Sequence, residues 1–345
     1  MTAKTKQQLL DEIAANFPDN NLYLITPAKL REVNVDMVDS MYGGSGGASA
    51  TALSVSATGS VSGDPSRKYV SPIGVECAGT YLVPTGKWVQ NLPLSNYAGC
   101  SSVTFSDLAG IVDNLTMSGS PANFSAPALY ATLGDFVCTT MASLDISGLK
   151  ATLGMLNITS SESLTALDLS NLIYTGISGT SESLTINLDN VPSLNLANYV
   201  GGSGGISITL FTATSLLLPS LKFSGPSLYF YYCTMITSLS LPSLERITGG
   251  GGLTVQFCSS LTDFSIGSNL KEIGGDVQMD NNALSQTSVD NMLLKLVSLD
   301  GTNGTVLFQA LDVILTGGTN SAPSATGLAA KATLEARGCT VSVNT

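Results

Sequence analysis

Two aspartates at equivalent positions of successive sequence units are the first candidates for chemistry. Asp145 and Asp168 lie 23 residues apart, and each is flanked by leucine or isoleucine. If the strands that hold them stack, the carboxylates lie about 5 Å apart, a separation at which two carboxylates can cleave a glycosidic bond. Asn195, Leu217 and Ser240 continue the same column. Because this column implies no apolar pocket around either carboxylate, it favours a row of solvated side chains over a catalytic pair.

Other catalytic and metal-binding residue types are scarce. The chain contains no histidine, the commonest general base and the commonest ligand of catalytic metals. Its six cysteines form no Cys-x-x-Cys pair, so no zinc site is predicted. Cys233 and Cys258 lie one unit apart, and we expect two stacked, buried thiols there rather than a disulfide. We therefore expect a non-enzymatic protein that holds no metal ion and no cofactor.

Three other segments have the composition of ligand-binding loops but lack the residue order that such loops require. Residues 276–282 carry carboxylate and amide oxygens, but the glycine and the ligand sequence of a calcium loop are missing. The glycine runs at 201–205 and 249–252 precede neither Lys-Ser/Thr nor a clear helix. We interpret both runs as turns rather than phosphate-binding loops.

Tyr229 and Tyr231 are the best candidates for a contact surface. Strand alternation directs Leu228, Phe230 and Tyr232 inward and these two tyrosines outward. The outward positions of the neighbouring units hold Ser207, Thr209, Thr254 and Gln256. Exposed tyrosines among hydroxyls and an amide suit contact with a glycan or a protein. The other interpretation is that a partner subunit or the linker covers them.

These side chains must be positioned by a two-strand unit that recurs six times between residues 144 and 279. The first strands begin 23, 27, 22, 23 and 25 residues apart. The second strands begin at Leu156, Leu184, Ile206, Leu228, Leu253 and Val277. A fixed period of this size indicates a solenoid, because one unit cannot bury its apolar edge alone. We expect the repeat solenoid to span residues 90–284.

The N-terminal part of the chain has a different pattern. Residues 1–42 predict two short helices, the second beginning at Thr26-Pro27, an N-cap followed by proline. The apolar stripe of that helix consists of Leu30, Val33, Met37 and Met41. We interpret residues 1–42 as a helical anchoring segment; the alternative is a helical cap folded back on the solenoid. Residues 43–89 read as a Gly/Ser-rich linker and an irregular β cover.

The C-terminal part, residues 285–345, predicts a small α/β cap. Helices are expected at 285–298 and 325–336, and strands at 311–315 and 339–343. Gly338 is the expected residue just past the second helix. Such a segment closes the open core of the last repeat, as terminal repeats must. The predicted fold class is thus mainly β, with a solenoid between a helical anchor and an α/β cap.

The amino-acid composition of the chain limits which kinds of partner it can bind. Charged residues make up 11% of the chain, against roughly 25% in ordinary soluble domains. A net charge of −11 argues against nucleic acid, which requires clustered Lys and Arg. No stretch of about 18 apolar residues predicts membrane insertion, and the N-terminus has no apolar core of a signal peptide.

Several segments resemble known families. Residues 239–247 and 270–277, with Asn281-Asn282, resemble leucine-rich repeats of the BspA and receptor L-domain type. Residues 317–324 and 328–338 are similar to the closing segment of repeat proteins in tailed-phage and prophage virion genes. Residues 22–33 are similar to N-terminal segments of phage fibre and vertex proteins. These resemblances imply a leucine-rich-repeat-like solenoid of a tailed-phage virion.

The expected function follows from the resemblance and the composition together. We expect a virion structural protein, made in the host cytoplasm, that forms a fibre or spike and contacts a glycan or protein of the host surface. Residues 1–42 would bind other virion proteins, and a homotrimer is expected by analogy with phage fibres. One alternative is a purely structural decoration of the capsid or collar. Another is a cellular surface adhesin of the leucine-rich-repeat type.

Overall fold

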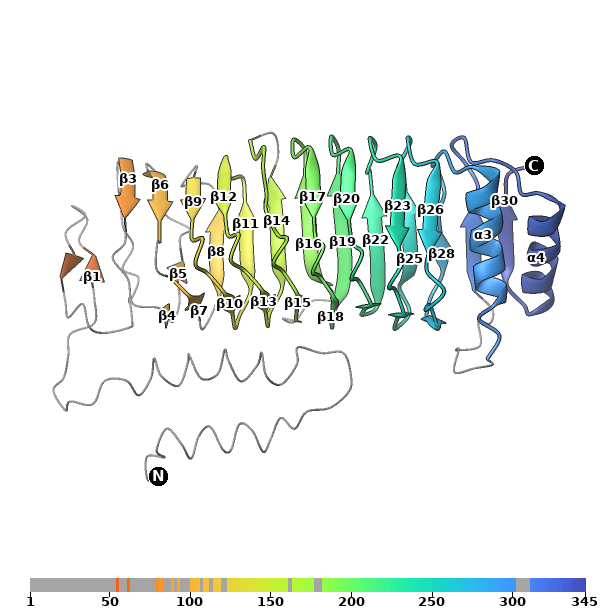
Figure 1. Cartoon of the computed structure of the whole chain (residues 1–345), viewed down its shortest axis with the longest axis horizontal. Helices are drawn as coiled ribbons and strands as arrows, with labels where there is room; N and C mark the ends of the chain where they lie inside the picture. The colour runs from red at the N-terminus through yellow and green to blue at the C-terminus, as the bar shows by residue number, and fades with distance from the viewer. Residues whose placement is uncertain are drawn as a thin grey trace, which may run out of the picture.

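The molecule is a rod of stacked β-strands that ends in two helices (Figure 1). In this computed structural model the described residues are 102–105, 108–111, 114–118, 123–160, 163–176, 182–301 and 311–345, together with short strands between residues 54 and 101. All strands of the rod pair in parallel with the strand of the preceding or following turn. The fold is therefore a parallel β-solenoid, which confirms the predicted mainly β repeat architecture.

The largest side of the solenoid is an 11-stranded parallel sheet that runs its whole length. Its strands, in order, are β5 (Leu92–Pro93), β8 (Leu115–Ser118), β11 (Phe136–Thr139), β14 (Leu156–Ser160), β16 (Glu182–Leu188), β19 (Gly205–Leu210), β22 (Ser227–Tyr231), β25 (Gly252–Gln256), β28 (Val277–Gln278), β29 (Asp312–Leu315) and β30 (Thr340–Val343).

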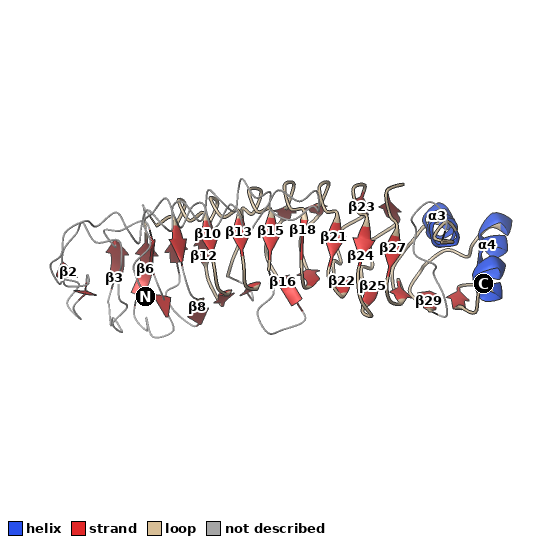
Figure 2. Ribbon diagram, turned by 90° about the horizontal axis from the view of Figure 1, so that it is seen from below, coloured by secondary structure: helices blue, strands red, loops and turns tan. Residues whose placement is uncertain are grey.

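A second side is a nine-stranded sheet of two-residue strands, visible from below in Figure 2. Its strands are β4 (Trp88–Val89), β7 (Gly110–Ile111), β10 (Ala131–Thr132), β13 (Ala151–Thr152), β15 (Tyr174–Thr175), β18 (Gly201–Gly202), β21 (Phe223–Ser224), β24 (Arg246–Ile247) and β27 (Glu272–Ile273). These strands were not predicted, because two residues are too few to show an alternation.

The third side is a ladder with interruptions. One piece consists of β3 (Gly79–Leu82), β6 (Cys100–Thr104), β9 (Asn123–Ser125) and β12 (Ser143–Asp145); two shorter pieces pair β17 (Ser193–Asn195) with β20 (Ser215–Leu217) and β23 (Ser238–Leu241) with β26 (Asp263–Ile266). A separate antiparallel pair joins β1 (Ser54–Val55) and β2 (Val61–Ser62).

The core is a set of apolar columns that run along the rod. Leu156, Leu184, Ile206, Leu228 and Leu253 are register partners in successive strands of the 11-stranded sheet, and all five are fully buried. Each turn leaves one side of such a residue open until the next turn covers it. Stacking therefore supplies the burial that a single turn lacks, as the repeat pattern predicted.

The C-terminal end carries α3 (Gln286–Val297) and α4 (Ala325–Ala336). Ser285 caps α3 and Ser324 caps α4 through their side-chain oxygens. Gly338 adopts φ +92°, the left-handed conformation expected after α4. With β29 and β30 these helices match the elements predicted for residues 285–345.

One predicted element lies outside the residues that the structure describes, and one predicted side-chain orientation is wrong. The helical anchor at residues 1–42, including Leu30, Val33, Met37 and Met41, lies outside the described residues. The inward orientation predicted for Tyr232 is wrong. Tyr232 has φ +49°, which interrupts the alternation, so Cys233 becomes the buried residue and Tyr232 is exposed.

Candidate functional site

The aspartate column consists of turn caps rather than a carboxylate pair. Asp145 accepts hydrogen bonds from the backbone N–H and the hydroxyl of Ser147 through one oxygen, at 3.2 and 2.9 Å. Asp168 accepts one from the N–H of Ser170 at 2.9 Å. The ladder is interrupted between the two: Asp145 ends one piece of it, and Asp168 pairs with Asn195. Each carboxylate thus holds the turn that follows its own strand.

The carboxylate and amide groups of segment 276–282 are also used in hydrogen bonds within the fold. Asp276 accepts a hydrogen bond from the N–H of Asp312 at 3.0 Å, and Asp280 accepts from the amide of Gln256. Asn282 is buried and bonded to Cys258 and Val255. Within the described part of the chain, no three His, Cys, Asp or Glu side chains gather as a metal site. No described helix is long and apolar enough to cross a membrane.

The two stacked cysteines and the two glycine runs have structural roles in the solenoid. Cys233 and Cys258 are free and buried, as predicted. The hydrogen bond to Cys258 and burial raise the pKa of the Cys233 thiol. Residues 249–251 form the expected turn, but Gly201–Gly202 are strand β18, not a turn. A Cβ atom on Gly202 would lie 2.1 Å from the hydroxyl of Ser183, so only glycine fits there.

Tyr229 and Tyr231 lie next to each other on the outer face of the 11-stranded sheet. Their ring centroids are 5.6 Å apart with an interplanar angle of 49°, and both side chains are half-buried. Their positions follow from β22, whose alternation buries Leu228 and Phe230. Partial burial and the neighbouring Tyr229 raise the pKa of Tyr231 above its ordinary value. The Tyr231 hydroxyl is consequently neutral at physiological pH and can donate and accept hydrogen bonds.

The predicted neighbours of the tyrosines are brought together as expected, with one difference in exposure. Tyr229 is the register partner of Ser207 and Thr254, and Tyr231 that of Thr209 and Gln256. Ser207, Thr209 and Gln256 are partly exposed. Thr254 is only 4% exposed and hydrogen-bonds to Tyr231, so it supports a tyrosine instead of facing solvent.

An exposed row of aromatic rings was missed by the sequence analysis. Phe211, Tyr232 and Phe257 follow directly on β19, β22 and β25, and we call these three residues the aromatic ridge. The Phe211 and Tyr232 centroids are 5.8 Å apart at 19°, and those of Tyr232 and Phe257 are 5.0 Å apart at 10°. The exposed fractions of the three side chains are 39%, 43% and 40%. The ridge adjoins the tyrosine pair, because Tyr231 and Tyr232 are consecutive.

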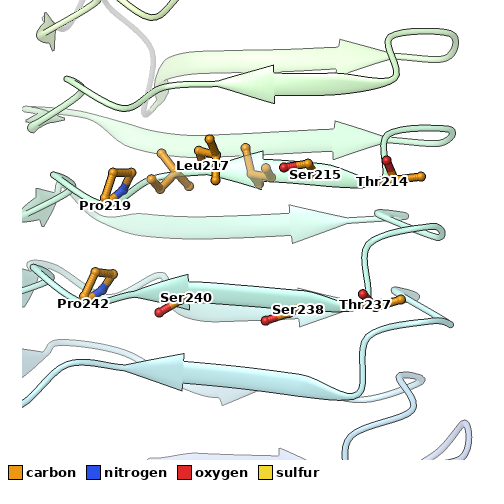
Figure 3. A pocket seen from close by; sticks show the side chains of 10 residues that line it. Thr214, Ser215, Leu217, Pro219, Thr237, Ser238, Ser240 and Pro242 are labelled. Atoms are coloured by element: carbon orange, nitrogen blue, oxygen red, sulfur yellow. The ribbon is translucent and has the colours of Figure 1, made fainter.

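A shallow groove lies on another side of the rod, where β20 and β23 are not hydrogen-bonded to each other (Figure 3). Its volume is about 390 Å³. It is lined by Thr214, Ser215, Leu216, Leu217, Leu218, Pro219, Thr237, Ser238, Ser240 and Pro242. Leu217 is 49% exposed at its edge. The lining holds hydroxyls and apolar groups only, and these side chains supply neither a general base nor a metal ligand set.

No protein family matches this chain, and neither the curated proteins nor the solved structures contain a match. The site is therefore interpreted from its own geometry. That geometry is a sheet face with two tyrosines, neighbours that are mostly hydroxyls and amides, and an adjoining aromatic ridge. The carboxylates of Glu182 and Asp280 accept hydrogen bonds from Thr185 and Gln256 on the same face. Such a surface can bind through stacking and hydrogen bonds.

Proposed function

We propose that this chain is a non-enzymatic attachment protein of a tailed-phage virion. In this proposal the leucine-rich-repeat-like solenoid is a fibre or spike that contacts the host cell surface through the outer face of its 11-stranded sheet. Residues 1–42 anchor it to other virion proteins, and the stripe Leu30, Val33, Met37 and Met41 joins three copies into a homotrimer. The contacted group is a glycan or protein of the host surface.

The tyrosine pair is the observation that carries this proposal. Tyr229 and Tyr231 interrupt an otherwise small, polar strip on the outer face of a sheet whose strands are all fixed by parallel pairing. The exposed or partly exposed outward residues on both sides are Asn157, Thr159, Thr185, Asn187, Ser207, Thr209, Gln256 and Gln278. A tyrosine ring can stack on a sugar or an apolar side chain while its hydroxyl group stays in water.

The test is adsorption of particles that carry Tyr229→Ser and Tyr231→Ser. Each lost aromatic contact is worth ~1–3 kcal/mol, so we expect adsorption to host cells to weaken by about tenfold or more. Adsorption is measured as the loss of free particles from the medium. The melting temperature of the purified variant should fall only slightly, because the buried residues of β22 are unchanged.

A matched control replaces Tyr130 and Tyr174 by serine. These two tyrosines are also half-buried, but they lie at the nine-stranded sheet. We expect their variant to adsorb normally. Normal adsorption of the Tyr229/Tyr231 variant would instead favour the purely structural decoration of a capsid or collar, and a chain absent from particles would favour a cellular adhesin.

A further inference from the structure

Two of the three residues of the aromatic ridge have a backbone conformation that bulky side chains disfavour. Tyr232 and Phe257 have φ +49° and +57°, values that are genuine outliers for bulky side chains. In the next turn Asn281 occupies the equivalent place with φ +59°, and asparagine tolerates this conformation well. The turn thus does not require an aromatic residue. Backbone strain combined with exposed rings indicates a function rather than a folding requirement.

A row of hydroxyl groups runs beside the ridge. Thr212, Thr234 and Ser259 each follow one of the ridge residues by one or two positions. The hydroxyl of Thr212 donates to the carbonyl oxygen of Asp189 at 2.6 Å, and that of Thr234 to the carbonyl oxygen of Phe211 at 2.7 Å. These two hydroxyl groups already donate, so their oxygens have lone pairs left with which to accept a hydrogen bond from a ligand. Each turn of the ridge therefore offers one apolar ring and one hydroxyl.

The ridge itself carries no charged side chain, and the nearest carboxylates lie at its two ends. Asp189 occupies the place of Phe211 in the preceding turn, and Asp280 accepts a hydrogen bond from Gln256, the residue before Phe257. The segments 190–221, 223–244 and 247–262 contain no Asp, Glu, Lys or Arg. An anionic polymer would need Lys or Arg side chains here, and a cationic one would need carboxylates along the ridge rather than only at its ends. The chemistry of this strip suits a neutral ligand.

We propose that the aromatic ridge binds a linear, uncharged polysaccharide that lies along the solenoid axis. The ridge repeats the same two groups, a ring and a hydroxyl, at ring spacings of 5.8 and 5.0 Å. A neutral polysaccharide repeats two matching groups, C–H surfaces and hydroxyls, in every sugar unit. The biological role of this binding rests on the proposed function, but the binding itself is a property of the isolated chain.

The experiment is affinity electrophoresis of the full chain in native gels that contain hydroxyethyl cellulose, dextran or mannan, with alginate as the charged comparison. We expect at least one neutral polymer to retard the protein and alginate to leave it unretarded. The ridge variant combines Phe211→Ser, Tyr232→Asn and Phe257→Asn. Its apparent Kd should rise by about tenfold or more. Asparagine suits the positive φ of two of these positions, so the variant should keep its circular dichroism spectrum and nearly its melting temperature.

A matched control combines Leu217→Ser, Leu294→Ser and Leu328→Ser. These side chains are 49%, 42% and 50% exposed and lie away from the ridge; their variant should be retarded like the wild type. Unchanged retardation of the ridge variant, or no retardation of the wild type by any neutral polymer, would overturn the proposal. So would a large loss of melting temperature, which would make the ridge a structural stack, or self-association that the ridge variant abolishes.

The two proposals fail separately. If the ridge variant loses retardation while the Tyr229/Tyr231 particles adsorb normally, the polysaccharide site stands and the proposed attachment role does not. If the tyrosine particles lose adsorption while the ridge variant binds polymer normally, the reverse holds.

Discussion

Tyr199 is the largest fully buried side chain among the described residues, and its hydroxyl is satisfied inside the core. It lies 2.7 Å from the hydroxyl of Thr175, which donates to Ser183 at 3.0 Å. Equivalent places in neighbouring turns hold Leu172 and Leu221. A Cβ atom on Gly202 of β18 would lie 2.1 Å from the Ser183 hydroxyl and 2.6 Å from the Thr175 hydroxyl, so this hydroxyl network depends on a glycine in the next strand. Burial raises the pKa of Tyr199, which keeps this network neutral.

We predict that Tyr199→Phe destabilises the protein by about 1–2 kcal/mol, because Thr175 loses a buried hydrogen-bond partner. Urea unfolding followed by circular dichroism measures the difference. Tyr174→Phe, a change at a half-buried tyrosine in β15, serves as the control and should stay within about 0.5 kcal/mol of the wild type. A Tyr199→Phe protein as stable as the wild type would show that the hydroxyl contributes nothing.

At the scale of elements, one corner of the solenoid is held by a column of buried side-chain donors. Cys233 and Cys258 direct their thiols to the carbonyl oxygens of Ile208 and Phe230, at 3.8 and 3.9 Å. Asn282 continues the column, donating to the carbonyl oxygen of Val255 at 2.7 Å. It also accepts from the N–H of Cys258 at 2.9 Å. Asn320 makes the same two hydrogen bonds in the cap. Its side-chain amide donates to the carbonyl oxygen of Met279, and its side-chain oxygen accepts from the N–H of Leu284. This column ties each turn to the turn before it.

Asn282→Leu should therefore destabilise the solenoid by about 2–5 kcal/mol, since two buried backbone groups lose their partner. The same urea titration gives the value. Asn281→Gly is the matched control: it keeps the positive φ at a partly exposed position and should change stability by less than about 1 kcal/mol. Equal stability of the two variants would contradict the role of the column.

The repeat strands could be predicted because alternation marks their inward residues. Leu228 and Phe230 are buried where the pattern places them, and the cap helices begin and end close to their predicted bounds. The aromatic ridge could not be predicted from alternation. The buried Leu210 follows Ile206 by four positions, but the buried Cys233 follows Leu228 by five. The extra residue, Tyr232, must take a left-handed conformation, and only the odd spacing signals it.

At the scale of the whole molecule, two ion pairs and the tyrosine pair lie on different sides of the rod. The ion pairs Lys222–Glu245 and Arg246–Glu272, at 4.0 and 3.6 Å, lie at the nine-stranded sheet. Lys150 lies 4.6 Å from the ring centroid of Tyr130 beside the same sheet. Exposed pairs of this kind add little stability, but they keep that side polar. The 11-stranded sheet presents hydroxyls, amides, the tyrosine pair and the carboxylates of Glu182 and Asp280, which accept hydrogen bonds from Thr185 and Gln256. The basic side chains of these contacts therefore lie on one side of the rod, and the tyrosine pair lies on another.

The central claim is that this chain is a virion attachment protein whose 11-stranded sheet face is free to meet the host. A density map of intact particles that carry the chain tests it most directly. We predict a solenoid that projects from the particle, with the face formed by β19, β22 and β25 open to solvent. A map in which capsid or collar subunits cover that face, or particles that lack the chain, would contradict the account.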